Sequence, residues 1–161
     1  MNLQLDRQIK WDLRYMALAA HIATWSKDPS TKVGAVLVRP NNSVASTGYN
    51  GFPPGADDSP HLYLDRSYKY EHVVHAEINA VDFFMEISKL TNLSGFTLYS
   101  SFPTCPDCME VLGPKGLSRI VQPSLKTEGR DDKWIEAWTE NLEKAQEIAN
   151  FYHVQLDTVD V

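Results

Sequence analysis

The stretch Pro103-Thr104-Cys105-Pro106-Asp107-Cys108 contains both cysteines of the chain, and His75-Ala76-Glu77 lies upstream of it. Together the two stretches offer two thiols and an imidazole, which are preferred zinc ligands, and a carboxylate that can carry protons. Three protein ligands leave the fourth position of a tetrahedral zinc ion open to water, and an open position separates a catalytic zinc site from a structural one. The pattern therefore predicts a catalytic zinc ion held by His75, Cys105 and Cys108.

The two halves of this pattern are weaker evidence when taken separately. A lone H-x-E arises by chance in a chain with five histidines, and a lone C-x-x-C also occurs in redox-active proteins. A structural zinc would need a fourth ligand, and the remaining histidines are the candidates for it; His72 is also a candidate contact for the substrate. These histidines are His21, His61, His72 and His153. Catalytic zinc is favoured because both halves are present at the expected starts of helices.

The composition is that of an ordinary globular protein. The chain has 161 residues, of which 43% are hydrophobic and 22% charged, so we expect a single domain over residues 1–161. No stretch approaches the roughly 18 apolar residues of a membrane span, and the N-terminus lacks the layout of a signal peptide. We therefore expect a cytoplasmic protein with no membrane partner.

The charge balance bears on the kind of ligand. The net charge is −6 and the pI is about 5.3. These values disfavour a long nucleic acid as partner, because binding of that kind depends on neutralising many phosphates. A single nucleotide is compatible with them, since a few local cations suffice for one phosphate.

Hydrophobic periodicity and turn residues predict an α/β fold. Residues 6–25 carry apolar side chains three and four positions apart, as in an amphipathic helix. Short apolar runs on either side of Arg39-Pro40-Asn41-Asn42 indicate a β-hairpin. We expect three layers, with a central mixed sheet and helices on both faces. The expected helices span residues 6–25, 76–90, 106–112 and 131–151, and the expected strands span residues 33–38, 43–49, 96–100, 117–121 and 153–156, with a long loop from residue 50 to about residue 60.

This layout gives the four site residues separate tasks. His75 stands at the start of one helix and the two cysteines bracket the start of another, so two positive helix ends would meet at the metal and favour thiolate over thiol. Glu77 points away from its neighbour His75 and can take up a proton, pass it to a ring nitrogen and assist the departure of ammonia. H-x-E followed by P-C-x-x-C is the pattern of zinc-dependent nucleobase deaminases, so it predicts deamination of a cytosine ring.

Between about residues 16 and 121 the sequence resembles the deoxycytidylate deaminase family. H-A-E with C-x-x-C marks only the wider superfamily, whereas G-Y-N-G-x-P followed by an acidic pair is typical of this branch. The matching stretches are residues 26–36 (SKDPSTKVGAV), residues 48–53 (GYNGFP), Gly55, Asp57-Asp58, Lys69-Tyr70, residues 75–80 (HAEINA) and the pair Cys105 and Cys108.

The resemblance implies the cytidine-deaminase fold and a catalytic zinc ion with His75, Cys105 and Cys108 as ligands and Glu77 as proton shuttle. It implies hydrolytic deamination of deoxycytidine monophosphate (dCMP) to dUMP with release of ammonia, which supplies dUMP for thymidylate synthesis. It also places Asn50 against the substrate sugar. An asparagine at a strand end can instead serve only the turn that follows.

The resemblance further implies regulation and assembly. Similar enzymes form hexamers, are activated by dCTP and are inhibited by dTTP, with Mg²⁺ on the triphosphate. The segment Gly48-Tyr49-Asn50-Gly51 matches the one linked to the effector site, and its glycines permit close approach of a nucleotide. Lys32 and Lys69 are candidate phosphate partners, although surface lysines are usually only solvated.

The chain departs from the family pattern in one stretch. Thr104 separates Pro103 from Cys105, where the family usually has proline directly before the first cysteine, so the loop beside the cytosine ring could differ. With no third cysteine, we expect no second zinc ion. Three alternatives stay open: a deaminase of another cytosine nucleotide, a deaminase of tRNA or single-stranded DNA, and a binding module in which zinc is only structural.

Overall fold

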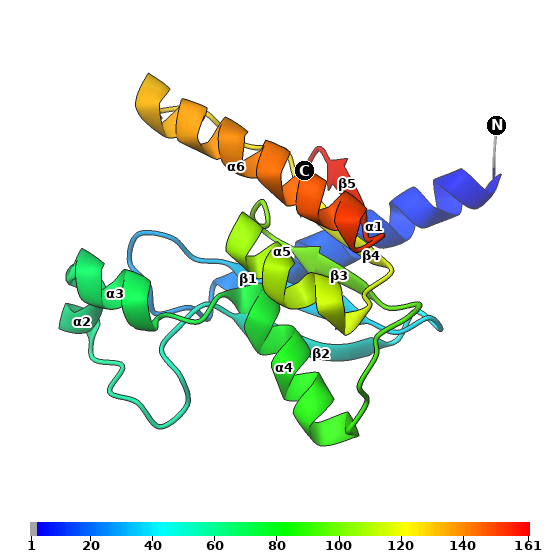
Figure 1. Ribbon diagram of the computed structural model, residues 1–161, viewed down its shortest axis with the longest axis horizontal. Coiled ribbons are helices and arrows are strands. Elements are labelled where there is room, and N and C mark those ends of the chain that lie inside the picture. Colours follow the sequence, from blue (N-terminus) through cyan, green and yellow to red (C-terminus); the bar gives the residue numbers. More distant parts are fainter. Residues whose placement is uncertain (1–2) are drawn as a thin grey trace.

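The centre of the molecule is a five-stranded sheet with the strand order β2-β1-β3-β4-β5, seen in a computed structural model that describes residues 3–161 (Figure 1). β1 (Gly34–Val38) pairs antiparallel with β2 (Val44–Tyr49) and with β3 (Thr97–Ser100). β3 pairs in parallel with β4 (Arg119–Pro123), which pairs in parallel with β5 (Gln155–Val159). The sheet is therefore mixed, which confirms the sequence prediction.

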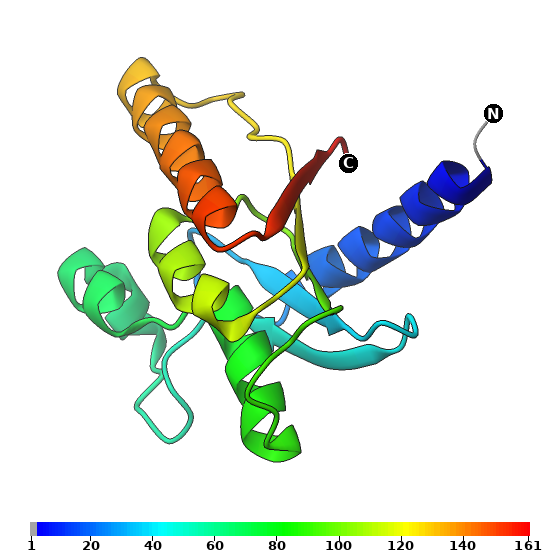
Figure 2. The same cartoon turned by 45° about the vertical axis from the view of Figure 1, so that its right-hand side comes forward.

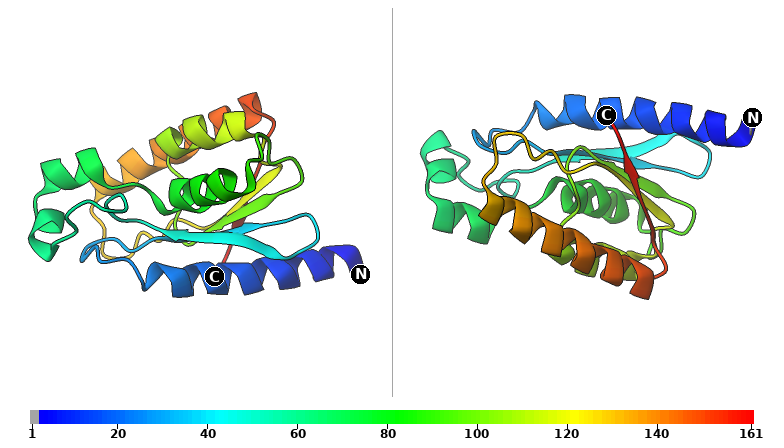
Figure 3. Two further views of the ribbon diagram at one scale, coloured as in Figure 1. Left: turned by 90° about the horizontal axis from the view of Figure 1, so that it is seen from below. Right: turned by 90° about the horizontal axis from the view of Figure 1, so that it is seen from above.

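Helices cover both faces of this sheet. α1 (Leu3–Ala23) lies along one face, while α4 (Ala76–Ser88), α5 (Pro106–Leu112) and α6 (Asp132–Phe151) lie on the other (Figures 2 and 3). The three expected layers are thus present. In the part of the chain that the structure describes, no helix combines the length and the apolar character that crossing a bilayer requires.

Each face of the sheet has its own hydrophobic core. The core under α1 contains Tyr15 and Tyr99, and the core on the opposite face contains Leu37 and Met109. β1 is buried along its whole length because it lies between the two layers, which explains its uninterrupted apolar sequence.

The segment between β2 and α4 contains two short helices that the sequence analysis did not anticipate. α2 (Pro60–Leu64) begins with proline in its first turn, and α3 (Arg66–His72) is capped by Asp65, whose side chain accepts a hydrogen bond from the backbone N–H of Tyr68. Helices of this length show no sustained hydrophobic period, so periodicity alone could not reveal them. Both lie at the end of the molecule where α4 and α5 begin (Figure 1).

The remaining differences from the expected elements are small. A 3₁₀ turn (Gly113–Lys115) follows α5. The last strand begins at Gln155 rather than at His153, because His153 adopts a positive φ of 58° that no strand permits. β4 is likewise displaced by two residues, to 119–123 from the expected 117–121.

Gly48 sets the distance between α4 and the sheet. A Cβ atom at Gly48 would lie 2.4 Å from the backbone N of Ala80 and 2.5 Å from the backbone O of Ala76. No side chain fits there, so α4 rests directly on β2. The N-terminal end of α4, with His75 and Glu77, takes its position from this contact.

Candidate active site

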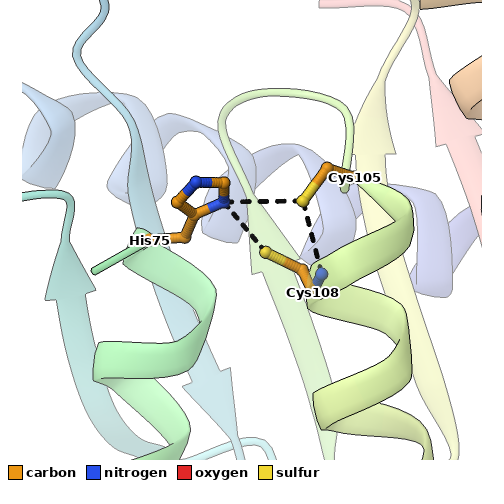
Figure 4. A group of neighbouring side chains, drawn as sticks. All are labelled: His75, Cys105 and Cys108. Atoms are coloured by element: carbon orange, nitrogen blue, oxygen red, sulfur yellow. Dashed lines mark hydrogen bonds between the residues drawn. The ribbon is translucent and has the colours of Figure 1, made fainter. Parts of the chain in front are cut away.

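Two helix N-termini meet at one point of the molecule. His75 is the N-cap residue of α4 and Cys105 is the N-cap residue of α5, with Cys108 inside the first turn of α5. The three side chains point toward one another (Figure 4): His75 Nδ1 lies 3.0 Å from Cys108 Sγ and 3.5 Å from Cys105 Sγ. Within residues 3–161, these three side chains are the only group of potential metal ligands, and their ligand atoms lie within 4.8 Å of one another.

The three side chains of this cluster shift one another's pKa values. Hydrogen bonding with Cys108 and with His75 outweighs burial and lowers the pKa of the Cys105 thiol to about 5. The same contact with Cys105, together with burial, raises the pKa of Cys108. The hydrogen bond with Cys105 raises the pKa of His75 against the effect of burial. One imidazole and two thiols that approach this closely fit zinc, which binds sulfur as thiolate.

Glu77 lies beside this cluster in the first turn of α4. Its side chain is buried, and burial is the largest cause that raises the pKa of its carboxyl group. The Ser100 hydroxyl lies 3.0 Å from Glu77 Oε1 and donates a hydrogen bond to it. Ser100, the last residue of β3, was missed by the sequence analysis; the available signal was its place at the strand end that leads into the cysteine loop.

A cavity of about 350 Å³ opens in front of Glu77, His75 and Cys105. Its walls come from the loop after α1, from the end of β2, from α3, from the cysteine loop and from the start of α6. The lining residues are Asp28, Ser30, Thr31, Val33, Asn50, Arg66, Lys69, Tyr70, Val73, His75, Ala76, Glu77, Phe102, Pro103, Cys105, Arg130, Trp134 and Trp138.

Asn50 lines this cavity, but its side-chain amide also has partners inside the protein. Its Oδ1 accepts a hydrogen bond of 2.8 Å from the backbone N–H of Val33, and its Nδ2 donates one of 2.8 Å to the carbonyl of Thr31. These bonds fix the orientation of the amide. Nδ2 also donates a longer hydrogen bond of 3.5 Å to Asp28 Oδ2, so the predicted contact with a sugar has to use what these three bonds leave, the second lone pair of Oδ1.

Lys69 also belongs to this cavity. Its ammonium group lies 2.7 Å from the carboxylate of Asp28, which is fully buried, and 2.7 Å from the hydroxyl of Ser30. Burial tends to raise the pKa of Asp28, but hydrogen bonds from Lys69, Ser30 and Thr31 outweigh it and lower that pKa. The pair ties α3 to the loop after α1.

The residues predicted to bind an effector are not brought together. Gly48, Tyr49 and Gly51 line a second cavity of about 280 Å³, whereas Asn50 lines the first. Lys69 lies with Asn50. Lys32 lines neither cavity and bonds to the carbonyl of Ser26.

Thr104, the residue that departs from the family pattern, is turned into the protein. It is fully buried, its backbone N–H donates to Gln122 Oε1 at 2.8 Å, and its hydroxyl has no partner among the described residues. Its neighbours Pro103 and Cys105 reach the cavity, so the extra residue is accommodated away from the cavity wall. The rings of His72 and Tyr68 contact each other at a tilt of 49°, with centroids 4.3 Å apart, and His72 lies outside both the ligand cluster and the cavity.

A mixed sheet that presents a His/Cys/Cys cluster at two helix N-termini, with a buried glutamate beside it, defines the class of zinc-type nucleobase deaminases. The chain belongs to the family described as the cytidine and deoxycytidylate deaminase zinc-binding region, which matches residues 9–122. The chain is thus an enzyme of the hydrolytic deaminase class.

Individual relatives agree with this family. An uncharacterised deaminase in the luxG 3′ region of Aliivibrio fischeri is 32% identical over 139 residues, which cover 86% of each chain. The human deoxycytidylate deaminase is 31% identical over 134 residues, which cover 79% of this chain and 72% of the human one. Among solved structures, the dCMP deaminase of cyanophage S-TIM5 in complex with dCMP and dUMP has a TM-score of 0.69 at 22% identity, and the match covers 99% of both chains. The structural match confirms the expected fold.

Proposed function

We propose that this protein converts dCMP and water to dUMP and ammonia. The observation that carries the proposal is the buried carboxyl group of Glu77 beside the His/Cys/Cys cluster, in a cavity of about 350 Å³. A cavity of that volume is in the range of small-molecule sites. Relatives named deoxycytidylate deaminase at 31% identity, and a cyanophage structure that holds dCMP and dUMP, support this choice of substrate.

His75, Cys105 and Cys108 would hold the zinc ion. When bound, the ion supplies the Lewis acidity that makes water a nucleophile near neutral pH. Two of the three ligands, His75 and Cys105, are the N-cap residues of α4 and α5, and Cys108 follows in the first turn of α5. The positive ends of α4 and α5 favour the thiolate form that a metal requires.

Glu77 is the residue that holds and moves the proton. Its buried carboxyl group, with a raised pKa, accepts a proton from the attacking water, delivers it to N3 of the cytosine ring and assists the departure of the amino group as ammonia. Ser100 suits both charge states of Glu77. Its hydroxyl donates to the ionised carboxylate, and it can turn toward the carbonyl of Phe102, 2.8 Å away, and accept a hydrogen bond from the protonated acid.

Substitution of Glu77 by glutamine tests this role. Glu77→Gln should retain one zinc ion per chain and lose turnover of dCMP by about 10²- to 10⁴-fold, the usual contribution of a general acid and base. The matched control is Glu110→Gln, because Glu110 is an exposed glutamate in the neighbouring helix α5. Ammonia release at the native rate from Glu77→Gln would refute the assignment.

An activity panel separates the substrates. dCMP, CMP, dCTP, deoxycytidine and deoxyadenosine should be compared at equal concentration, with dCMP expected to give the highest kcat/KM. Equal rates on a cytosine-containing oligonucleotide would favour the nucleic-acid alternative instead. The net charge of −6 disfavours such a substrate, because its binding depends on neutralising many phosphates.

The proposal extends to regulation, assembly and place of action. We expect a single-domain, cytoplasmic enzyme that forms hexamers and supplies dUMP for thymidylate synthesis. It should be activated by dCTP and inhibited by dTTP, with Mg²⁺ on the triphosphate. Rates should rise sigmoidally with dCMP concentration and become hyperbolic with dCTP. A hyperbolic curve that neither triphosphate changes would remove the allosteric part and leave the deamination chemistry intact.

A further inference from the structure

Two arginines on the rim of the active-site cavity have no acidic partner. Arg66 lies in the first turn of α3, and Arg130 lies just before α6. Among the described residues, neither guanidinium group makes an ion pair or a side-chain hydrogen bond, whereas the guanidinium of Arg119 binds two carboxylates. Both arginines are exposed and line the cavity that also contains Glu77.

Arg130 is held in place by a ring and not by a carboxylate. Its guanidinium carbon lies 4.5 Å from the ring centroid of Trp134. From there a row of aromatic rings continues inward: Trp134 and Trp138 have centroids 5.9 Å apart, and Trp138 and Phe102 have centroids 4.9 Å apart. A guanidinium that stacks through its face keeps its N–H donors at the edge available for an anion.

The cavity therefore has two chemically different ends. The inner end carries Glu77 and the metal-ligand cluster. The only other carboxylate among the described residues of its lining, Asp28, is neutralised by Lys69 at 2.7 Å. The rim carries the charges of Arg66 and Arg130, which form no ion pair among the described residues, in a chain whose net charge is −6. A ligand that complements both ends has a cytosine ring at one side and a phosphate at the other.

The two arginines come from segments far apart in the sequence but close in the fold. Figures 1 and 3 place α3 and the start of α6 at the same end of the molecule. Arg130, Trp134 and Trp138 lie beyond residue 122, where the match to the family ends. This part of the cavity wall is thus a feature of the chain outside the family region.

We propose that Arg66 and Arg130 grip the 5′-phosphate of the nucleotide and set the preference of this enzyme for nucleoside monophosphates over nucleosides. The inference rests on the proposed function, because it assumes that a cytosine nucleotide occupies the cavity. Guanidinium groups bind phosphate through paired, charge-assisted hydrogen bonds, so two of them account for recognition of a dianion. Trp134 is the positioning residue that orients Arg130.

The test compares dCMP with deoxycytidine in Arg66→Gln, Arg130→Gln and Arg130→Lys. Each glutamine variant should lower kcat/KM for dCMP by about 10- to 100-fold, the equivalent of losing charge-assisted hydrogen bonds, and leave kcat/KM for deoxycytidine unchanged. Arg130→Lys keeps the positive charge but loses the planar guanidinium. Its kcat/KM for dCMP should therefore lie between the values of the native enzyme and of Arg130→Gln. The affinities for dCMP and deoxycytidine should also be measured by calorimetry in proteins that carry Glu77→Gln in addition to each arginine substitution, so that no turnover occurs. The ratio of the two affinities should change from variant to variant as the ratio of the two kcat/KM values does.

Arg14 provides a matched control. Its guanidinium lies over Trp11 at 4.9 Å from the ring centroid, in the same kind of stack as Arg130 on Trp134, but it lines neither cavity. Arg14→Gln should therefore leave the ratio of kcat/KM for dCMP to kcat/KM for deoxycytidine at its native value. Thermal melting of all variants should agree within a few degrees, because each arginine is exposed and none has a buried partner.

Three outcomes would overturn the inference. The first is that both glutamine variants keep the native ratio of kcat/KM for dCMP to kcat/KM for deoxycytidine. The second is that kcat/KM falls equally for both substrates. The third is that the native enzyme deaminates dCMP and deoxycytidine equally well. This result would refute the phosphate subsite and still establish the deaminase activity. An enzyme that releases ammonia from neither compound would refute the proposed function, whereas weaker binding of dCMP to Arg130→Gln would still support the subsite.

Discussion

The hydroxyl of Ser100 ties Glu77, the proposed proton shuttle, to the sheet. Glu77 is almost entirely buried, and Ser100 Oγ, 3.0 Å away, is the protein hydroxyl that hydrogen-bonds it. A buried carboxylate that loses its donor bears the full cost of its desolvation. The rate of proton transfer should therefore depend on a residue that never touches the substrate.

Replacement of Ser100 by alanine should lower kcat by about 10- to 100-fold, because a hydrogen bond to a charged group contributes about 1.5–3 kcal/mol. The KM for dCMP should change little, since the ring and the sugar keep their contacts. Steady-state kinetics on zinc-loaded protein checks both numbers.

The neighbouring Ser101 is the control for this experiment. Its hydroxyl accepts a hydrogen bond of 2.9 Å from the backbone N–H of Gly34 and makes no hydrogen bond with Glu77. Ser101→Ala should cost stability of about 1 kcal/mol and leave kcat at its native value. Equal losses of kcat in the two variants would mean that Ser100 acts only through folding.

At the scale of elements, the position of α4 on the sheet decides whether the site exists. His75 and Glu77 stand on its first turn, and Gly48 lets that helix approach β2 without a gap. In the sequence, Gly48 and Gly51 look equivalent, as the two glycines of one segment. The structure separates them, because a Cβ at Gly51 would meet only the hydroxyl of Tyr63 at 3.5 Å, an ordinary contact.

Gly48→Ala should push α4 away from the sheet and impair both folding and turnover. Overpacking of this kind costs about 1–3 kcal/mol, and backbone atoms 2.4 Å away cannot yield as a side chain would. Gly51→Ala should stay within about 1 kcal/mol of the native free energy of unfolding. Urea denaturation and zinc content measure the two effects, and an equally stable Gly48→Ala would contradict this account of the packing.

The elements also show how far the sequence could predict this structure. The helix starts at His75 and Cys105 follow from local signals, namely an apolar period after one and Pro106 after the other, and the sequence predicts both. α3 is too short for a sustained apolar period, so the place of Arg66 on the cavity could not be anticipated, and Lys69 was expected there only through the family resemblance. Arg130 and Trp134 reach the cavity only because α6 packs beside α5, a tertiary contact that no local pattern encodes.

At the scale of the whole molecule, one buried ion cluster holds α1 to the sheet. Asp12 on α1 accepts two hydrogen bonds from Arg119 of β4, at 2.7 and 2.8 Å, and one from Tyr99 of β3 at 2.8 Å. Arg119 also binds Asp157 of β5 at 2.6 Å. The cluster thus joins one outer layer to three strands, on the face opposite the active site.

The cluster should make the stability of the protein depend on pH in the acid range. Burial tends to raise the pKa of Asp12, but hydrogen bonds from Arg119, Gln8 and Tyr99 outweigh burial and lower that pKa below its ordinary value. A carboxyl whose folded-state pKa is lowered stabilises the folded protein above its unfolded-state pKa of about 4. This contribution is lost as the pH falls through the folded-state pKa.

Asp12→Asn should therefore have two effects on the free energy of unfolding. At pH 7 the free energy of unfolding should fall by about 1.5–3 kcal/mol, because Asp12 loses its charge-assisted hydrogen bonds with Arg119, which keeps Asp157 as a partner. Between about pH 5 and pH 2 the variant should show a shallower loss of stability than the native protein, since the linked protonation is gone. The control is Asp82→Asn, which breaks the partly exposed bridge to Lys115 and should cost less than about 1 kcal/mol at any pH. Parallel acid-stability curves for the native protein and Asp12→Asn would show that the titration of Asp12 is not linked to folding.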